Sequence, residues 1–196
     1  MPGPSLIGLT GGIAAGKSEA LRILAGLGAE TISTDGLVHE LLATAAVRDR
    51  LVERWGEAVV QDGEVDRAAV AAIVFERPDE LQWLESLLHP LVRERVQAWA
   101  HELPEGTAVA VVEVPLLFEG GMEPVFDATI AVVAADEERL ARAAVRGHDG
   151  FEGRAGRQLS QDEKAAKATH VVENHGSLAD LAGELERLFP ELVAAQ

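Results

Sequence analysis

Short apolar runs alternate with stretches of helical spacing along most of the chain. The apolar runs cover residues 6–10, 29–33, 108–114, 127–133 and 169–173. After the first run, apolar residues recur every three or four positions from Ala20 to Leu27, which predicts a helix that ends at Gly28. Short strands rich in valine and isoleucine that alternate with helices are typical of a parallel sheet covered on both faces. The pattern therefore predicts an α/β fold.

The interval between the second and third apolar runs departs from this alternation. Its apolar spacing is helical throughout, in stretches that cover 35–43, 46–55, 65–75 and 78–103. Helices alone between two strands predict an insertion that packs on one sheet-based core. We expect a single domain with a core of residues 1–34 and 104–196 and a helical insertion of residues 35–103.

A glycine-rich segment separates the first predicted strand from the first predicted helix. Its sequence from Gly11 to Ser18, GGIAAGKS, matches the phosphate-loop pattern G-x-x-x-x-G-K-[ST]. In such a loop the backbone N–H groups and the helix N-terminus face a phosphate. We expect Lys17 to reach the terminal phosphates of a nucleoside triphosphate and Ser18 to bind Mg²⁺. The rest of the cradle would be formed by Gly11, Gly12, Ile13, Ala14, Ala15 and Gly16. The alternative is a tight turn that binds no ligand.

Carboxylates lie at the ends of several predicted strands, where open α/β sheets bind their ligands. Asp35 follows the second strand, and with the phosphate loop at the end of a neighbouring strand we expect its carboxylate to face the terminal phosphate. Capping of the next helix is the alternative role for Asp35. Glu113 ends the third strand and either orients Mg²⁺ through water or bonds to nearby backbone. Asp136 is predicted to cap a helix.

Composition narrows the class of protein. The chain has 196 residues, no cysteine and a formal net charge of −16 from 17 basic and 33 acidic residues. The lack of cysteine excludes disulfides, thiolate metal sites and a cysteine nucleophile. So acidic a chain argues against binding to nucleic acid or to an anionic membrane, and the sequence shows neither a membrane span nor a signal peptide. We expect a cytoplasmic protein whose partners are small molecules.

Basic residues nevertheless gather in one segment. Seven of them, against four acidic residues, fall between residues 139 and 167: Arg139, Arg142, Arg146, Arg154, Arg157, Lys164 and Lys167. Arg142 and Arg146 are spaced i, i+4 and would repel each other on one helical face unless an anion lay between them. The segment is a candidate for a second anion-binding site, and a solvated helix face is the alternative.

These features together provide the parts that phosphoryl transfer requires: a triphosphate cradle, a magnesium ligand, a carboxylate for the acceptor hydroxyl and additional cations. A GTP-binding switch protein is expected to carry an Asn-Lys-x-Asp motif, but the single asparagine, Asn174, is followed by His175. A small-molecule kinase is therefore the interpretation. A kinase for another nucleotide or a sugar acid, and a non-catalytic ATP-binding module, remain as alternatives.

The chain resembles one family of such kinases, the dephospho-CoA kinases, along nearly its whole length. The resemblance rests on LIGLTGGIAAGKS, STDGLVHELL, FERPDELQWLESLLHPLV, VVEVPLLFEGG, RLARAAVR and RAGRQLSQDEKAAKATHVVENHG. It implies a three-layer phosphate-loop kinase fold with a five-stranded parallel sheet, a helical acceptor-binding insertion and a lid at about residues 139–160. It also implies transfer of the terminal phosphoryl group of ATP to the ribose 3′-hydroxyl of dephospho-CoA, the last step of coenzyme A synthesis.

The same resemblance implies roles for individual residues. Asp35 would orient or deprotonate the acceptor hydroxyl. Arg142 and Arg146 would belong to the lid. Asn174 and Gly176 would lie beside the adenine of ATP.

Other residues of the insertion allow two interpretations. His89 falls in the family-like LLHPLV segment and either contacts the acceptor or packs between helices. Trp55, Trp83 and Trp99 either wall the acceptor pocket or belong to the core. The chain departs from the family where Ser33 replaces the first aspartate of an Asp-x-Asp pattern that ends at Asp35.

Overall fold

The computed structural model describes residues 3–139 and 158–195. Contacts between residues divide the chain into two compact units, which are considered separately below. The first unit comprises Met1–Ser33 and Glu102–Gln196, and the second comprises Thr34–His101. The assignment of an acceptor-binding insertion and a lid stays a prediction, and most of the predicted lid lies outside the described residues.

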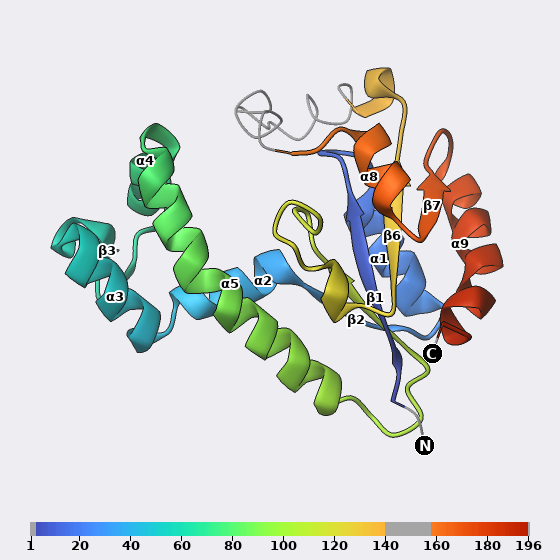
Figure 1. Ribbon diagram of the computed structural model, residues 1–196, viewed down its shortest axis with the longest axis horizontal. Coiled ribbons are helices and arrows are strands. Elements are labelled where there is room, and N and C mark those ends of the chain that lie inside the picture. Colours follow the sequence, from blue (N-terminus) through green and yellow to red (C-terminus); the bar gives the residue numbers. More distant parts are fainter. Residues whose placement is uncertain (1–2, 140–157, 196) are drawn as a thin grey trace. The chain divides into compact units, whose positions relative to one another are not determined.

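A parallel sheet of five strands in the order β2-β5-β1-β6-β7 forms the centre of the first unit (Figure 1). The strands are β1 (Ser5–Gly11), β2 (Glu30–Ser33), β5 (Val109–Glu113), β6 (Ala128–Val133) and β7 (His170–Glu173). Each strand falls on one of the apolar runs, so the predicted α/β fold is confirmed. One expectation is wrong: β2 is not a neighbour of β1, because β5 pairs with both. At about 4.8 Å between adjacent strands, the ends of β1 and β2 are about 10 Å apart.

Three helices of the first unit lie wholly within the described residues, α1 (Lys17–Gly26), α8 (Gln161–Lys167) and α9 (Leu178–Val193), together with a 3₁₀ turn η2 (Glu123–Val125). Alternate residues of β1 face opposite sides of the sheet. Ile7 and Leu9 are fully buried in a core that α1 and α9 share with the sheet. On the other side, a Cβ at Gly8 would lie 2.6 Å from Leu117 Cδ1 and 2.8 Å from Phe126 Cδ2, so a larger residue here would have to displace these two side chains.

The second unit is mostly helical. It contains α2 (Thr34–Leu42), α3 (Ala45–Trp55), η1 (Glu57–Val59), β3 (Val60–Gln61), β4 (Glu64–Val65), α4 (Arg67–Glu76) and α5 (Pro78–His101). The expectation of helices alone is wrong, since β3 and β4 form an antiparallel hairpin. Asp62 and Gly63 connect the two strands with φ angles of 53° and 84°. Positive φ at both central residues is the geometry that Asp-Gly supplies in a tight hairpin turn.

A buried carboxylate connects α3 to α5 in this unit. Glu80 Oε2 accepts hydrogen bonds from Arg54 Nε at 2.9 Å and from Trp55 Nε1 at 2.8 Å. Trp55 packs edge to face on Trp83, with ring centroids 5.1 Å apart. The hydrogen bonds from Arg54 and Trp55 lower the pKa of Glu80 from its ordinary value, against the effect of burial. Trp55 and Trp83 thus help to join two helices of the unit.

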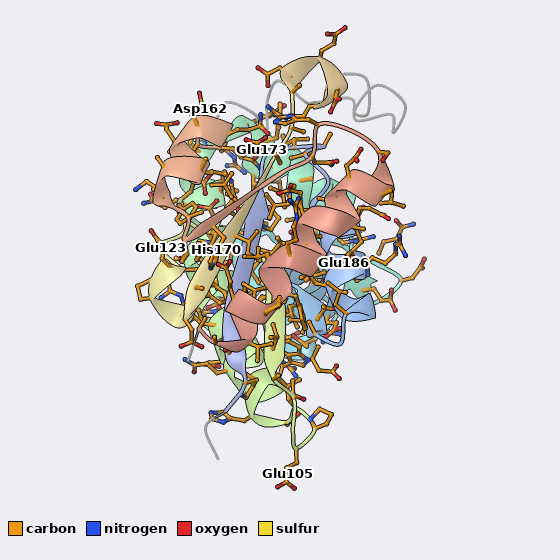
Figure 2. The ribbon with its side chains drawn as sticks, turned by 90° about the vertical axis from the view of Figure 1, so that its right-hand side faces the viewer. Glu105, Glu123, Asp162, His170, Glu173 and Glu186 are labelled. Carbon is orange, nitrogen blue, oxygen red and sulfur yellow. The ribbon has the colours of Figure 1, made fainter. Side chains whose placement is uncertain are left out.

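The net negative charge is spread over the surface. Glu105, Asp162, Glu173 and Glu186 are exposed, as Figure 2 shows from the side of β7 and α9. No helix within residues 3–139 and 158–195 is long and apolar enough to cross a membrane.

Candidate active site

The loop between β1 and α1 has the backbone conformation that its glycines predict. Gly11 and Gly16 have φ angles of 154° and 109°, which residues with a side chain rarely adopt. A Cβ at Gly11 would lie 2.4 Å from the Val132 carbonyl oxygen, and one at Gly16 would lie 2.2 Å from Asn174 Nδ2. Both motif glycines are therefore required by the close approach of the ends of β6 and β7.

Several amide groups of this loop are available to a ligand. The N–H of Ala15 donates to the Gly12 carbonyl oxygen at 3.2 Å. By contrast, the N–H groups of Ile13, Ala14 and Gly16 have no acceptor within the described parts of the chain. They lie directly before the N-terminus of α1, where the helix dipole favours negative charge. Unpaired donors at a helix N-terminus form a site for phosphate oxygens.

Side chains hold the loop through its carbonyl oxygens. Lys17 Nζ donates to the carbonyls of Gly11 at 3.2 Å and Gly12 at 3.0 Å. Asn174 Nδ2 donates to the Ala15 carbonyl at 2.8 Å. The lysine thus lies at the loop, where it can exchange these bonds for bonds to phosphate. Ser18 is exposed at the second position of α1, so its hydroxyl can reach a ligand bound to the loop.

Asn174 and Gly176 follow β7, as the sequence predicted. Asn174 is buried, and its own N–H donates to the Val133 carbonyl oxygen at 2.7 Å. Its side chain therefore supports the loop, and contact with adenine stays a prediction. A Cβ at Gly176 would lie 2.5 Å from Asp180 Oδ2, the carboxylate that bonds to Ser177 in the capping box of α9. A side chain at position 176 would therefore have to displace the Asp180 carboxylate from the capping box of α9.

Glu113 lies between the strand of the loop and the strand that precedes Asp35. In the sheet it is level with Leu9 of β1 on one side and Ser33 of β2 on the other. Its side chain is buried. The described residues contain no cluster of histidine, aspartate and glutamate that could hold a metal ion by itself. A Mg²⁺ site would therefore combine Ser18 with phosphate oxygens and water, the coordination usual for this ion.

A buried ion pair that the sequence analysis missed lies beside the loop. Lys164 of α8 is fully buried, and its Nζ contacts the Pro115 carbonyl oxygen at 2.6 Å and Glu119 Oε1 at 3.0 Å. The same carboxylate oxygen accepts from the Leu159 N–H at 2.9 Å. Burial lowers the pKa of Lys164, and the Glu119 carboxylate opposes this effect.

The ion pair corrects one part of the sequence interpretation. Lys164 was grouped with the basic residues of a possible anion-binding segment, but it is enclosed and paired with Glu119. Charge along the chain could not reveal this pairing, because Glu119 is 45 positions away. The only sequence signal for Glu119 and Lys164 was that each falls in a segment resembling the family, VPLLFE and QDEKAAK respectively.

The remaining site predictions fall into two groups. Arg142, Arg146, Arg154 and Arg157 lie outside the described residues. Asp35 and His89 belong to the second unit. Asp35 is exposed in the first turn of α2, which begins one residue earlier at Thr34, and His89 is partly buried in α5.

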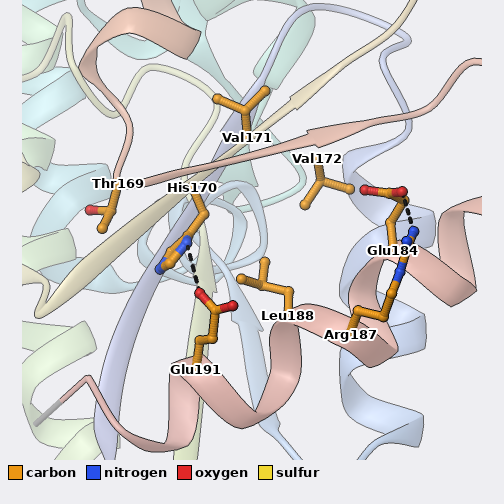
Figure 3. A pocket seen from close by; sticks show the side chains of 8 residues that line it. All are labelled: Thr169, His170, Val171, Val172, Glu184, Arg187, Leu188 and Glu191. Atoms are coloured by element: carbon orange, nitrogen blue, oxygen red, sulfur yellow. Dashed lines mark hydrogen bonds and ion pairs between the residues drawn. The ribbon is translucent and has the colours of Figure 1, made fainter.

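A shallow pocket elsewhere in the first unit is separate from the loop. It lies between β7 and the second half of α9 (Figure 3). His170 and Glu191 face each other across it at 3.8 Å, and Arg187 pairs with Glu184 at its rim. None of its lining residues comes from the phosphate loop, so it contributes nothing to this site.

Sequence comparison identifies relatives along nearly the whole chain. A family model for dephospho-CoA kinase matches residues 5–180. A curated dephospho-CoA kinase of Deinococcus radiodurans is 38% identical over 193 residues, which cover 96% of this chain and 93% of the relative. One of Protochlamydia amoebophila is 35% identical over 193 residues, or 95% of each protein.

Solved structures agree with these relatives. A Thermus thermophilus protein superposes with a TM-score of 0.83 at 36% identity, covering 97% of this chain and 99% of its own. Dephospho-CoA kinase from Campylobacter jejuni superposes with a TM-score of 0.73 at 26% identity, covering 96% and 97%. Shikimate kinase from Acinetobacter baumannii, at 16% identity and a TM-score of 0.54, shares the fold alone. With a family model and full-length relatives in agreement, and a phosphate loop formed as its motif requires, the chain belongs to the dephospho-CoA kinase family.

Proposed function

We propose that this protein transfers the γ-phosphoryl group of ATP to the ribose 3′-hydroxyl of dephospho-CoA, giving coenzyme A and ADP. The observation that carries the proposal is the loop of Gly11–Ser18 in a chain of this family: its unpaired amides, together with the side chain of Lys17, would form a triphosphate cradle. Catalysis of such a transfer consists mainly of positioning and of electrostatic stabilisation.

The loop would bind the nucleotide through groups already in place. The N–H groups of Ile13, Ala14 and Gly16 would donate to phosphate oxygens. Lys17 would leave the carbonyls of Gly11 and Gly12 and pair with the terminal phosphates. This exchange gives the ammonium a charged acceptor in place of two neutral ones, and hydrogen bonds between charged groups are the stronger ones.

The metal and the acceptor would be served by two further residues. Ser18 would supply one hydroxyl ligand to Mg²⁺, which neutralises charge on the β- and γ-phosphates when bound. Asp35 would accept the proton of the 3′-hydroxyl while the hydroxyl oxygen forms its bond to the γ-phosphorus. The bond from the γ-phosphorus to the bridging oxygen breaks, and ADP leaves with the electron pair. The family resemblance and the exposure of Asp35 after β2 support this role.

The other roles rest on the resemblance. Arg142 and Arg146 would provide lid cations for the charge that develops during transfer, and Asn174 and Gly176 would border the adenine. His89 would contact the acceptor. A cytoplasmic location and the absence of nucleic-acid and membrane partners stay predictions from composition, and the oligomeric state stays open.

A coupled assay of ADP release tests the proposal. Purified protein is supplied with ATP and Mg²⁺ and, in separate reactions, with dephospho-CoA, nucleoside monophosphates, gluconate or shikimate. We expect ADP release that depends on dephospho-CoA and exceeds release with every other acceptor by at least about a hundredfold, because an acceptor site that hydrogen-bonds its ligand discriminates strongly. Release with a different acceptor would identify another kinase. ATP binding without acceptor-dependent release would identify a non-catalytic module.

A further inference from the structure

Arg139 lies against the phosphate loop at Gly12 and Ile13. Its Nε donates to the Ile13 carbonyl oxygen at 3.0 Å, and its Nη1 donates to Asp136 Oδ1 at 2.7 Å. The Arg139 side chain is 15% exposed, whereas that of Asp136 is 81% exposed. The guanidinium group is thus enclosed on the side of the loop, and its aspartate partner is in solvent.

The surroundings of Arg139 are shaped to receive it. A Cβ at Gly12 would lie 3.1 Å from Arg139 Cζ and 3.1 Å from Gln161 Cγ, so the missing side chain of Gly12 makes room for both. Gln161 is itself fixed, since its amide accepts from the Ala134 N–H at 2.9 Å and donates to the Ala134 carbonyl at 2.8 Å. The arginine therefore occupies a defined place between the loop and α8.

The planarity of the peptide bond links this contact to nucleotide binding. In a trans peptide the C=O of one residue and the N–H of the next point in opposite directions. The Ile13 carbonyl and the Ala14 N–H belong to one such unit, so a donor that holds the carbonyl outward turns the N–H inward. Asn174, through the Ala15 carbonyl, does the same for the N–H of Gly16.

We propose that Arg139 is a positioning residue for nucleotide binding, which orients the Ala14 N–H toward the phosphates by holding the Ile13 carbonyl oxygen. The inference rests on the proposed function only in requiring that ATP binds the loop. Because ATP and ADP both place a β-phosphate there, the effect should be the same for the two nucleotides. It should change affinity rather than the rate of transfer at saturation, since a less ordered loop has to be ordered again on binding.

The variant Arg139→Met tests this role, because methionine keeps an apolar stem against Gly12 and removes every donor. We expect the Kd values for ATP and for ADP, measured by calorimetry, to rise equally and by about tenfold, the effect of one lost hydrogen bond from a charged group. The kcat at saturating ATP should stay within about twofold. In the free protein, the backbone N–H order parameter of Ala14, measured by NMR relaxation, should decrease. Asp136→Asn is the matched control and should change Kd by less than about twofold, because it removes only an exposed partner.

Other results would overturn the inference. Unchanged Kd values in folded Arg139→Met would show that the loop keeps its phosphate-binding conformation without Arg139. A loss for ATP much larger than for ADP would show that Arg139 contacts the γ-phosphate directly. If Arg139→Met does not fold, Arg139→Gln, which retains one donor, is measured in its place and should show a smaller, equal rise for both nucleotides. Wild-type protein that binds ATP but does not phosphorylate dephospho-CoA would refute the proposed function and leave this test intact.

Discussion

Gly11 and Gly16 show how neighbouring strand ends constrain single residues of the loop. Each has a positive φ, and each faces an atom less than 2.5 Å from where a Cβ would lie. The motif in the sequence identifies these glycines, but only the folded sheet shows that the Val132 carbonyl and the Asn174 amide are what exclude a side chain. The Lys17 side chain lies at the loop, where it is partly exposed and outside the core.

Replacement of Lys17 by alanine should abolish most activity and leave the fold intact. The side chain is partly exposed and donates to two carbonyls of the loop, so its loss opens no cavity in the core. We expect kcat for ADP release to fall by at least about a hundredfold, the usual effect of removing a group that stabilises transition-state charge. Thermal unfolding followed by circular dichroism should stay within a few degrees.

The exposed Lys167 of α8 offers a matched control. Lys167→Ala removes the same charge from the same unit and should leave kcat unchanged. Near-normal turnover in folded Lys17→Ala would contradict the assignment of the phosphate loop.

Asp35→Asn should lower turnover far more than it weakens ATP binding. The amide keeps the size of the side chain but loses the charge that attracts the acceptor proton, and general-base catalysis contributes about a hundredfold or more. Steady-state kinetics with dephospho-CoA and calorimetry with ATP measure the two effects separately. Glu40→Gln, an exposed position on the same helix, is the control. A normal turnover rate in Asp35→Asn would show that another group accepts the proton of the acceptor hydroxyl.

At the scale of elements, α3 and α5 are joined by the hydrogen bonds of Glu80 described above. The folded-state pKa of Glu80 is lower than the value of 4.5 expected for the unfolded chain, mainly through the bond from Arg54. Below pH 4.5 the unfolded state therefore binds more protons than the folded state. The stabilisation from ionised Glu80 is complete above this pH and is lost as the pH falls through the folded pKa.

Glu80→Gln should therefore destabilise the protein at neutral pH and less so in acid. We expect the difference in unfolding temperature between wild type and variant to be constant from pH 7 to about pH 5.5, and to shrink as the pH decreases below 4.5. Thermal melts across this range measure it. Glu94→Gln, at an exposed position of α5, should show no such dependence. A difference that grows toward low pH would show that the carboxylate is not stabilised in its charged form.

The apolar pattern of the sequence predicted some strands better than others. The strands β1, β5 and β6 are buried on both faces, so their continuous apolar runs were sufficient. The hairpin of β3 and β4 was missed because its strands have only two residues each, too short for any apolar period. Its signal was the turn Asp62-Gly63, whose composition favours positive φ. The only sequence signal for this element was therefore its turn composition, which the search for apolar periodicity did not use.

At the scale of the whole molecule, the charge of −16 should make stability depend on salt. Like charges repel in the compact state, and salt reduces the Debye length from about 10 Å at 0.1 M to about 3 Å at 1 M. We expect the unfolding temperature to rise by a few degrees between 20 mM and 500 mM NaCl. Potassium chloride should have the same effect, since screening depends on ionic strength. A decrease with both salts would show that surface ion pairs outweigh the net repulsion.

The sequence by itself determined the alternation of strands and helices, the phosphate loop and the family, because each depends on residues that are close along the chain. Only the tertiary structure decided that β5 separates β1 from β2, that Glu119 pairs with the buried Lys164, and that Arg139 and Asn174 hold the loop through its carbonyl oxygens. These contacts join residues 45 to 159 positions apart, and nothing in their local sequence specifies the partner. Strand order and packing bring such residues together, so the fold, rather than the motif, determines which side chains orient the phosphate site.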